Sequence, residues 1–85
     1  MKHIILEKHK YTELVFNRIN KKLKTTLDKE WIKKYIFNLI KKSKEEDIIK
    51  KWKNFYIYNK IDNIRITVNW FTYTVITVDK FKPNY

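Results

Sequence analysis

The sequence predicts an α+β fold, in which two or three N-terminal helices pack on a three-stranded antiparallel β-meander. A short N-terminal strand is an optional addition to this sheet. Apolar residues recur at helical spacing as far as residue 53 and alternate with polar residues from residue 54 onward. The 85 residues contain no internal repeat and no linker-like stretch. We therefore expect one small domain over residues 1–85, with an N-terminal arm at 1–10 and a C-terminal tail at 80–85.

Helical patterns dominate the first half of the chain. After an apolar arm or short strand at His3–Glu7, Thr12 is expected to cap a helix with the apolar stripe Val15, Phe16, Ile19 and Leu23. Asp28 is expected to cap a longer helix. Its core-facing surface is predicted to be two rows at i, i+4 spacing: Trp31, Tyr35 and Leu39, beside Ile32, Ile36 and Ile40. Ser43–Glu46 has the form of a capping box and predicts a third helix, with inward-facing Ile48, Ile49 and Trp52.

The second half of the chain is typical of three strands. The first two are expected to form a hairpin through a loop at Lys60–Asn63, which pairs Tyr58 with Arg65 and Ile57 with Ile66. The third strand, Thr72–Val78, is apolar on both faces, and a β-bulge or a subunit contact would reconcile this. Trp70 and Phe71 lie at the last strand junction, where burial in the core or in a dimer is expected.

The chain has no glycine and no cysteine. The missing glycines exclude Walker and Rossmann phosphate loops, which need glycine where the backbone approaches a phosphate. Turns that require positive φ are expected to use Asn or Asp, and Asn59, Asp62, Asn63 and Asn69 lie at predicted turns. The missing cysteines exclude disulfides, thiolate metal sites and cysteine nucleophiles.

No catalytic residue, metal site or cofactor is predicted. His3 and His9 are the only histidines, and they lack both metal-motif spacing and an evident acidic partner. No apolar run is long enough to span a membrane, and the N-terminus is too polar for a signal peptide. We expect a cytoplasmic protein without a membrane partner, either a monomer or a homodimer.

The net charge of +11 is the feature that points beyond the fold. The codon usage of an AT-rich genome explains why 18 of the 20 basic residues are lysine, but it does not explain the shortage of acids. Such an excess favours a polyanionic partner, either DNA or RNA or an acidic protein surface. Residues 1–53 hold 16 basic and 7 acidic residues, so the charge lies mainly on the predicted helices.

Two surfaces are predicted to bind nucleic acid. The outer side of the second helix carries Phe37, which is placed to stack on a base or to anchor a partner protein. The lysines expected to follow a phosphate backbone there, and along the next segment, are Lys33, Lys34, Lys41, Lys42, Lys50, Lys51 and Lys53. On the outer sheet face, Tyr58 and Arg65 beside Tyr56 are typical of single-stranded RNA binders. Alternatively, their cross-strand packing only stabilises the hairpin.

The segments NIRITVN and TYTVITVDK are similar to the terminal strand pair of the RelE-like ribonuclease toxins. This resemblance implies an enzyme that works without histidine, with Arg65, Lys80, Lys82 and Tyr85 as the residues to suspect. The chain departs from that family in its tail and in having only two arginines. Fold analogy of this kind does not establish activity.

The segments YTELVFNRINKKL, NIRITVN and TYTVITVD resemble a family of small bacterial proteins classified as a domain of unknown function. The resemblance extends from Tyr11 to Asp79 and implies a compact α+β domain without assigning it an activity.

We therefore expect a non-enzymatic protein that binds nucleic acid through a lysine-rich helical surface. The second hypothesis is a protein that binds a nucleic-acid-processing enzyme and inhibits or regulates it. A mobile element could encode such a protein. The RelE-like ribonuclease is the third.

Overall fold

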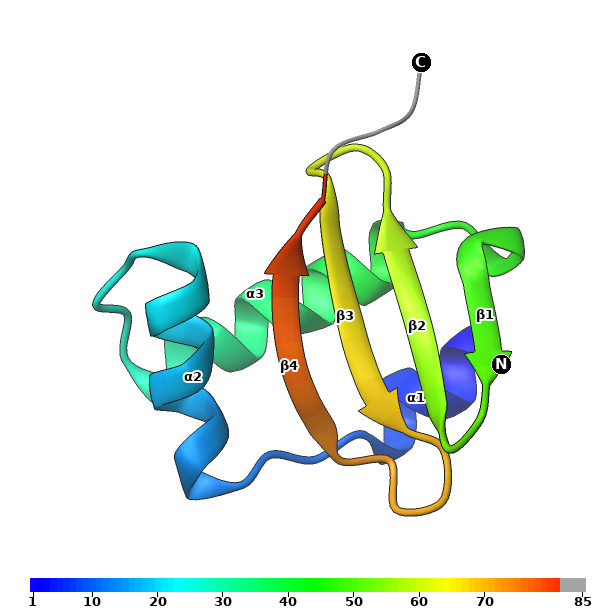
Figure 1. Cartoon of the computed structure of the whole chain (residues 1–85), viewed down its shortest axis with the longest axis horizontal. Helices are drawn as coiled ribbons and strands as arrows, with labels where there is room; N and C mark the ends of the chain where they lie inside the picture. Colours follow the sequence, from blue (N-terminus) through cyan, green and yellow to red (C-terminus); the bar gives the residue numbers. More distant parts are fainter. Residues whose placement is uncertain (82–85) are drawn as a thin grey trace.

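The computed structural model describes residues 1–81, which form helices followed by an antiparallel sheet (Figure 1). The elements are α1 (Lys2–Lys8), α2 (Glu13–Leu23), α3 (Lys29–Lys42), the 3-10 turn η1 (Glu45–Asp47), β1 (Ile48–Lys51), β2 (Asn54–Asn59), β3 (Ile64–Asn69) and β4 (Val75–Lys80). The strands pair in chain order, β1-β2-β3-β4. The predicted α+β class is confirmed, with one more strand than expected.

One face of the sheet supports the core. In Figure 1, α1 and α3 lie behind the sheet and α2 lies beside the edge strand β4. Alternate residues of each strand point to the helices, as the two-residue period of a strand requires. The fully buried side chains include Ile5, Ile19, Ile32, Ile36, Ile40, Ile57, Ile66, Val68 and Val78. Within residues 1–81, no helix covers the opposite face of the sheet (Figure 1).

The predicted hairpin is confirmed, and of the two explanations offered for the third strand the structure shows the bulge, although that strand spans Val75–Lys80 rather than Thr72–Val78. Tyr58 pairs with Arg65 and Ile57 pairs with Ile66 across β2 and β3. The register of β3 with β4 shifts between Thr67 and Val68. Because a bulge moves one residue out of the alternation, Val75 and Val78 both reach the core despite their odd spacing.

The N-terminal arm predicted at residues 1–10 is instead mostly the helix α1. Ile5 is buried against the core, and the His9 ring binds the carbonyl oxygens of Ile5 and Leu6 at 2.9 Å, which ends the helix. A short apolar run does not distinguish a strand from a buried helical turn, so packing against α3 decides the outcome. The expected N-terminal strand is reduced to one bridge between Lys10 and Thr74.

The prediction of a third helix after Ser43 is wrong. Ser43 ends α3 rather than beginning a new helix, because its Oγ donates to the Leu39 carbonyl oxygen at 2.7 Å. Only the turn η1 follows, and the chain then enters β1, where Ile48 pairs with Ile57. Ile48 is buried as expected, whereas Ile49 and Trp52 are exposed.

The caps of α2 and α3 lie where they were predicted. Asp28 caps α3 by accepting from the Trp31 backbone N–H at 2.8 Å, and Thr12 occupies the N-cap position of α2 without a side-chain bond. Trp31, however, is 55% exposed rather than part of the core. The helices bury the isoleucine row of α3, and Leu39 of the neighbouring row, but leave the N-terminal end of that row open to solvent.

Positive φ angles occur mostly at residues other than those predicted. Of the Asn and Asp residues at turns, Asn63 alone has positive φ among residues 1–81. The others in that region are Lys24, Trp52 and Tyr73, with φ between 56° and 59°. Asn59 and Asn69 instead accept backbone N–H groups of the loops that follow them. Without glycine, this chain places large side chains in left-handed conformations at a cost of about 1–2 kcal/mol each.

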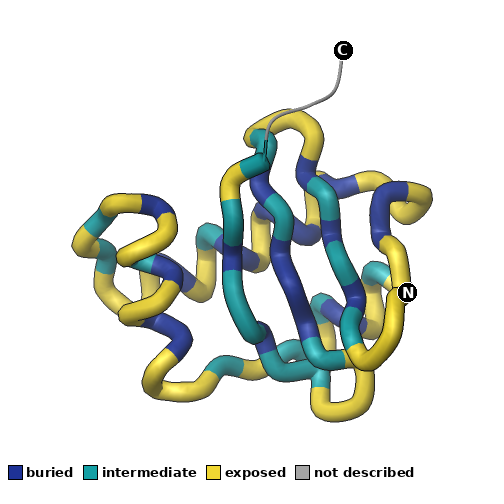
Figure 2. Tube along the Cα trace, in the orientation of Figure 1, coloured by how far each residue is buried: buried dark blue, intermediate teal, exposed yellow. Residues whose placement is uncertain are grey.

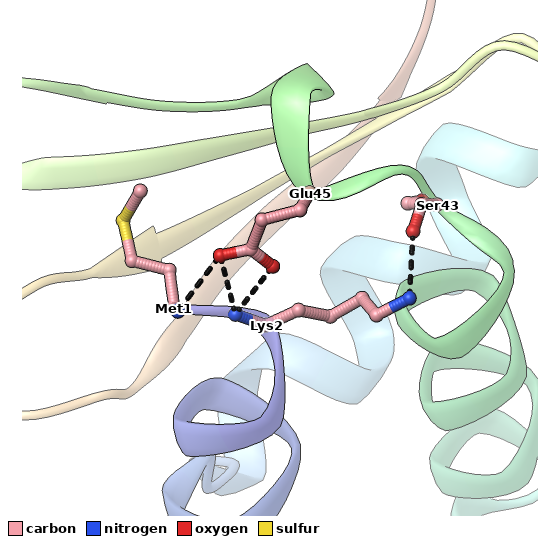
Figure 3. Close-up of polar contacts among 4 residues, drawn as sticks. All are labelled: Met1, Lys2, Ser43 and Glu45. Carbon is pink, nitrogen blue, oxygen red and sulfur yellow. Dashed lines mark hydrogen bonds and ion pairs between the residues drawn. The ribbon is translucent and has the colours of Figure 1, made fainter.

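The start of α1 is attached to the end of α3 by polar contacts (Figure 3). The Met1 ammonium group lies 2.7 Å from a carboxylate oxygen of Glu45, which also accepts from the Lys2 backbone N–H. Lys2 Nζ donates to the carbonyl oxygens of Lys41 and Ser43 at 3.0 and 3.1 Å. The positive charge of this ammonium group also interacts favourably with the negative, C-terminal end of the α3 helix dipole.

These contacts predict a pH-dependent contribution of Glu45 to stability. The hydrogen bond with the Met1 ammonium is the main cause that lowers the pKa of Glu45. Because the folded pKa is below the unfolded value, the stabilisation exists above about pH 4.3 and is lost as the pH falls through the folded pKa. Glu45→Gln should lower the urea midpoint at pH 7, with a loss in free energy of unfolding of less than about 1 kcal/mol for so exposed a pair.

The matched control for this experiment is Glu46→Gln at the neighbouring exposed carboxylate. It should leave the midpoint at pH 7 unchanged, and both variants should match the wild type near pH 2. A Glu45→Gln effect that persists at full size in acid would contradict an ionic origin.

Candidate functional site

Most of the basic side chains are not neutralised by acids. Within residues 1–81, ion pairs hold five of them: Lys22, Lys29, Lys33, Lys60 and Arg65. The remaining lysines of α3, and all the lysines of β1 and the turn after it, form no ion pair in that part of the chain. Two surfaces combine such unpaired lysines with exposed aromatic rings, one on α3 and one at an end of the sheet.

The α3 surface is the side of α3 that faces solvent. Lys33, Lys34, Lys41 and Lys42 are exposed there, and Phe37 between them is 41% exposed. Lys34 and Lys41 are seven residues apart, which is about 10 Å along a helix axis and about three base steps of one DNA strand. Lys33 is the one lysine of this group with an ion pair, a loose contact of 3.7 Å with Glu30.

Two hollows lie side by side on the α3 surface, with volumes of about 300 and 400 Å³. Lys34 and Asn38 line both. The smaller hollow adds Trp31, Tyr35, Leu39, Lys42 and Asp62, and the larger adds His9, Tyr11, Lys33 and Phe37. Aromatic rings thus accompany the lysines on both sides of the same helix.

The larger hollow has a rigid wall made by His9 and Tyr11. Carbonyl oxygens only accept, so the His9 Nδ1 atom that faces Ile5 and Leu6 carries a proton. His9 Nε2 in the neutral ring then accepts from the Tyr11 hydroxyl at 3.1 Å. Burial raises the pKa of Tyr11 above its ordinary value, which keeps this hydroxyl protonated. Burial, and secondarily Asp62, likewise raises the pKa of Tyr35 in the smaller hollow.

The other surface, which we call the sheet-end surface, comprises the β1–β2 and β3–β4 turns and their flanking residues. Lys50, Lys51 and Lys53 were expected on a helix that continues the α3 surface; they lie instead on edge strand β1 and its turn. A backbone hydrogen bond of 2.8 Å from Trp70 N to Lys53 O joins the two turns. Both turns are drawn as exposed at the lower end of the sheet in Figure 2.

Aromatic residues project from the sheet-end surface. Trp52 is 85% exposed and Phe71 is 79% exposed, which contradicts the burial expected for Phe71 and for Trp70 beside it. Lys50 Nζ lies 3.8 Å from the centroid of the Trp70 ring, within cation–π distance. A hollow of about 410 Å³ is lined by Lys53, Asn69, Trp70, Phe71 and Thr72.

Tyr58 and Arg65 lie together on the uncovered sheet face, but Arg65 is already engaged. Its guanidinium is 3.5 Å from Asp79, which also binds Lys22 at 3.1 Å. Burial acts to lower the pKa of Arg65, while Tyr58 and Asp79 together raise it above its ordinary value. Arg65 also lies 5.8 Å from the Tyr56 ring centroid, so these contacts support the interpretation as cross-strand packing.

Two of the residues suggested by the ribonuclease resemblance lie among the described residues, Arg65 on β3 and Lys80 at the end of the neighbouring strand β4. Lys82 and Tyr85 lie outside the described residues, as does the end of the predicted tail. Phe81 at the start of that tail packs edge-on against Tyr58, with ring centroids 5.5 Å apart.

The described residues hold no group of three or more His, Cys, Asp or Glu side chains placed to bind a metal ion. None of the helices in that region is both long enough and apolar enough to cross a membrane. Both the α3 surface and the sheet-end surface combine lysines with exposed aromatic rings, which suits them to binding a ligand.

The sequence interpretation missed Trp31, Trp52, Trp70 and Phe71 as surface residues. One signal could have found Trp52: the segment 48–61 contains no acidic residue and places Trp52 among three lysines. An aromatic residue in such a run is poorly suited to a core. Nothing comparable in the sequence marks Trp31, because it lies in register with the buried residues of α3.

The fold and these surfaces define a small, basic α+β protein with three helices ahead of a four-stranded antiparallel sheet. A family model described as protein of unknown function (DUF3781) matches residues 3–79. The chain belongs to this family. Neither the curated proteins nor the solved structures contain a match to it.

Proposed function

We propose that this protein binds nucleic acid without sequence specificity, with the α3 surface following the phosphate backbone. The observation that carries the proposal is that Lys34, Lys41 and Lys42 are exposed on one helix and form no ion pair within residues 1–81. Lysines in this state can release the counterions of a polyanion on contact, which is the main source of sequence-independent affinity.

The composition of the surface supports nucleic acid over an acidic protein. A phosphate backbone presents charges at regular spacing, and the lysines of α3 repeat along a straight element. The rings of Trp31 and Phe37 beside those lysines offer faces on which bases can stack. Asp62 at the edge of the smaller hollow disfavours a phosphate there, so phosphates are expected closer to Lys34 and Lys41.

The experiment is a salt titration of binding by fluorescence anisotropy, with labelled single-stranded and duplex DNA and RNA. At about 50 mM salt the dissociation constant should be micromolar or tighter, and log K should fall linearly with log salt. A slope of about −3 would correspond to about three neutralised phosphates. Polyglutamate serves as the control polyanion, and it should compete poorly at equal charge.

The absence of binding to every probe at about 50 mM salt would overturn the proposal. Equal competition by polyglutamate would also overturn it, because the surface would then recognise charge alone.

A further inference from the structure

We infer that the sheet-end surface stacks on unpaired bases, so that the preferred ligand is a single-stranded nucleic acid. The inference rests on the proposed nucleic-acid binding and names the form of nucleic acid that is bound. Its elements are Trp52, Trp70 and Phe71, together with Lys50 and Lys53.

The backbone conformation of Trp52 lowers the stability of the fold. It occupies the first position of a two-residue hairpin loop between Lys51 and Asn54, with φ of 59°. Positive φ in such loops favours glycine or asparagine, and a bulky residue there is strained. Its side chain gains little from burial, because it is 85% exposed. Lys24 and Tyr73 have the same conformation, but Tyr73 packs against the core, so among residues 1–81 Trp52 is the large ring at positive φ that no packing offsets. This indicates a role outside the fold.

The rings are presented by a rigid scaffold. Asn69 Oδ1 accepts from the backbone N–H groups of Phe71 and Thr72, both at 2.9 Å. The Asn69 N–H donates to the Thr74 carbonyl oxygen at 2.8 Å, and the bond from Trp70 N to Lys53 O ties the neighbouring turn to it. Because the backbone of these turns is already ordered, no loop has to become ordered when a base stacks on the rings, which lowers the entropy cost of binding.

The charge around the rings matches a nucleic-acid strand. Residues 48–61 and 63–78, which include both turns, contain no acidic side chain. Lys50, Lys51 and Lys53 therefore give this end of the sheet a positive potential. Stacking faces combined with a positive groove are the features by which proteins bind single strands.

The hollow favours a base over a lipid. Its lining combines two rings, Trp70 and Phe71, with the polar side chains of Lys53, Asn69 and Thr72. A nucleobase has an apolar face and polar edges, and it suits such a lining. A membrane interface would be better served by a continuous apolar tip. In a duplex the base faces are already stacked, so they are not available to these rings.

The test compares wild type with Trp52→Asn and Phe71→Ala, using oligo-dT, oligo-U and duplex DNA of about 12 residues at constant salt. Each variant should weaken single-strand binding by about fivefold or more. Duplex affinity and the salt slope should be unchanged, because no charge is removed. Trp52→Asn should melt no lower than wild type, since asparagine tolerates positive φ. The dT and U arms distinguish DNA from RNA.

One control matches the exposure. Ile61→Ala removes an apolar residue that is 75% exposed at the other end of the sheet. The Ile61 variant should behave as wild type. Lys53→Ala should reduce the salt slope by about one.

The outcomes separate this inference from the proposed function. Equal binding of single strands and duplex, with no effect of Trp52→Asn or Phe71→Ala, would overturn the inference and leave electrostatic binding intact. Loss of phosphatidylserine-vesicle binding in these variants, with oligonucleotide binding unchanged, would also overturn it and assign the surface to lipid. No binding of any oligonucleotide by wild type would overturn both.

Discussion

Asn59→Ala is expected to lower the free energy of unfolding by about 3 kcal/mol, the largest effect of any polar substitution in the sheet. Asn59 is fully buried at the end of β2. Its Nδ2 donates to the Leu39 carbonyl oxygen at 3.0 Å, and its Oδ1 accepts from the Ile61 and Asp62 N–H groups. Alanine would remove three hydrogen bonds and leave a cavity between α3 and the β2–β3 loop.

Thermal and urea unfolding of the purified variant would measure this loss. For a domain of this size, about 3 kcal/mol corresponds to a melting temperature lower by roughly 12–24 °C. Asn69→Ala is the matched control, because Asn69 also accepts two loop N–H groups but is half-exposed and its side chain bonds only to the loop that follows it. It should cost about 1 kcal/mol. Equal losses in the two variants would show that the bond to Leu39 contributes nothing.

Reversing the charge at Lys34, Lys41 and Lys42 is expected to weaken nucleic-acid binding by about 100-fold or more at about 50 mM salt. Three Lys→Glu changes alter the charge of the α3 surface by six units, and they place carboxylates where the proposal puts phosphates. The difference from wild type should shrink as salt rises, because screening weakens both attraction and repulsion.

The control reverses three other exposed lysines, Lys21, Lys24 and Lys80, and so makes the same change in net charge. It should reduce affinity far less than the α3 variant. Circular dichroism would check that both variants keep the fold. Equal losses would mean that the net charge of the molecule, rather than the α3 surface, sets the affinity.

The fold could be predicted well wherever a local pattern had one physical meaning. The i, i+4 row of Ile32, Ile36 and Ile40 and the cap at Asp28 identified α3, because a helix presents that spacing on one side. The alternation around Ile57 and Ile66 identified the hairpin and its register, because a shift by one residue would turn the apolar side chains to the other face.

The prediction failed where one pattern fits two structures. Ser43–Glu46 has the pattern of a capping box, but the Ser43 hydroxyl donates to the preceding helix. The residues that follow pair with β2 as strand β1, and this pairing excludes a helix there. His3–Glu7 is too short for periodicity to decide, and α1 is helical because α3 offers Ile5 a surface. Strand pairing and helix packing are non-local, and no window of sequence contains them.

The candidate site shows the same division. The excess of lysine and the outer side of α3 were evident from the sequence, since charge and helical spacing are local properties. The sheet-end surface was not evident, because its two turns are about 18 residues apart and meet through strand pairing across β2 and β3. Trp52, Trp70 and Phe71 resemble core residues in any sequence window. Only the tertiary structure places them in solvent, because the helices cover the middle of the sheet and leave its end bare.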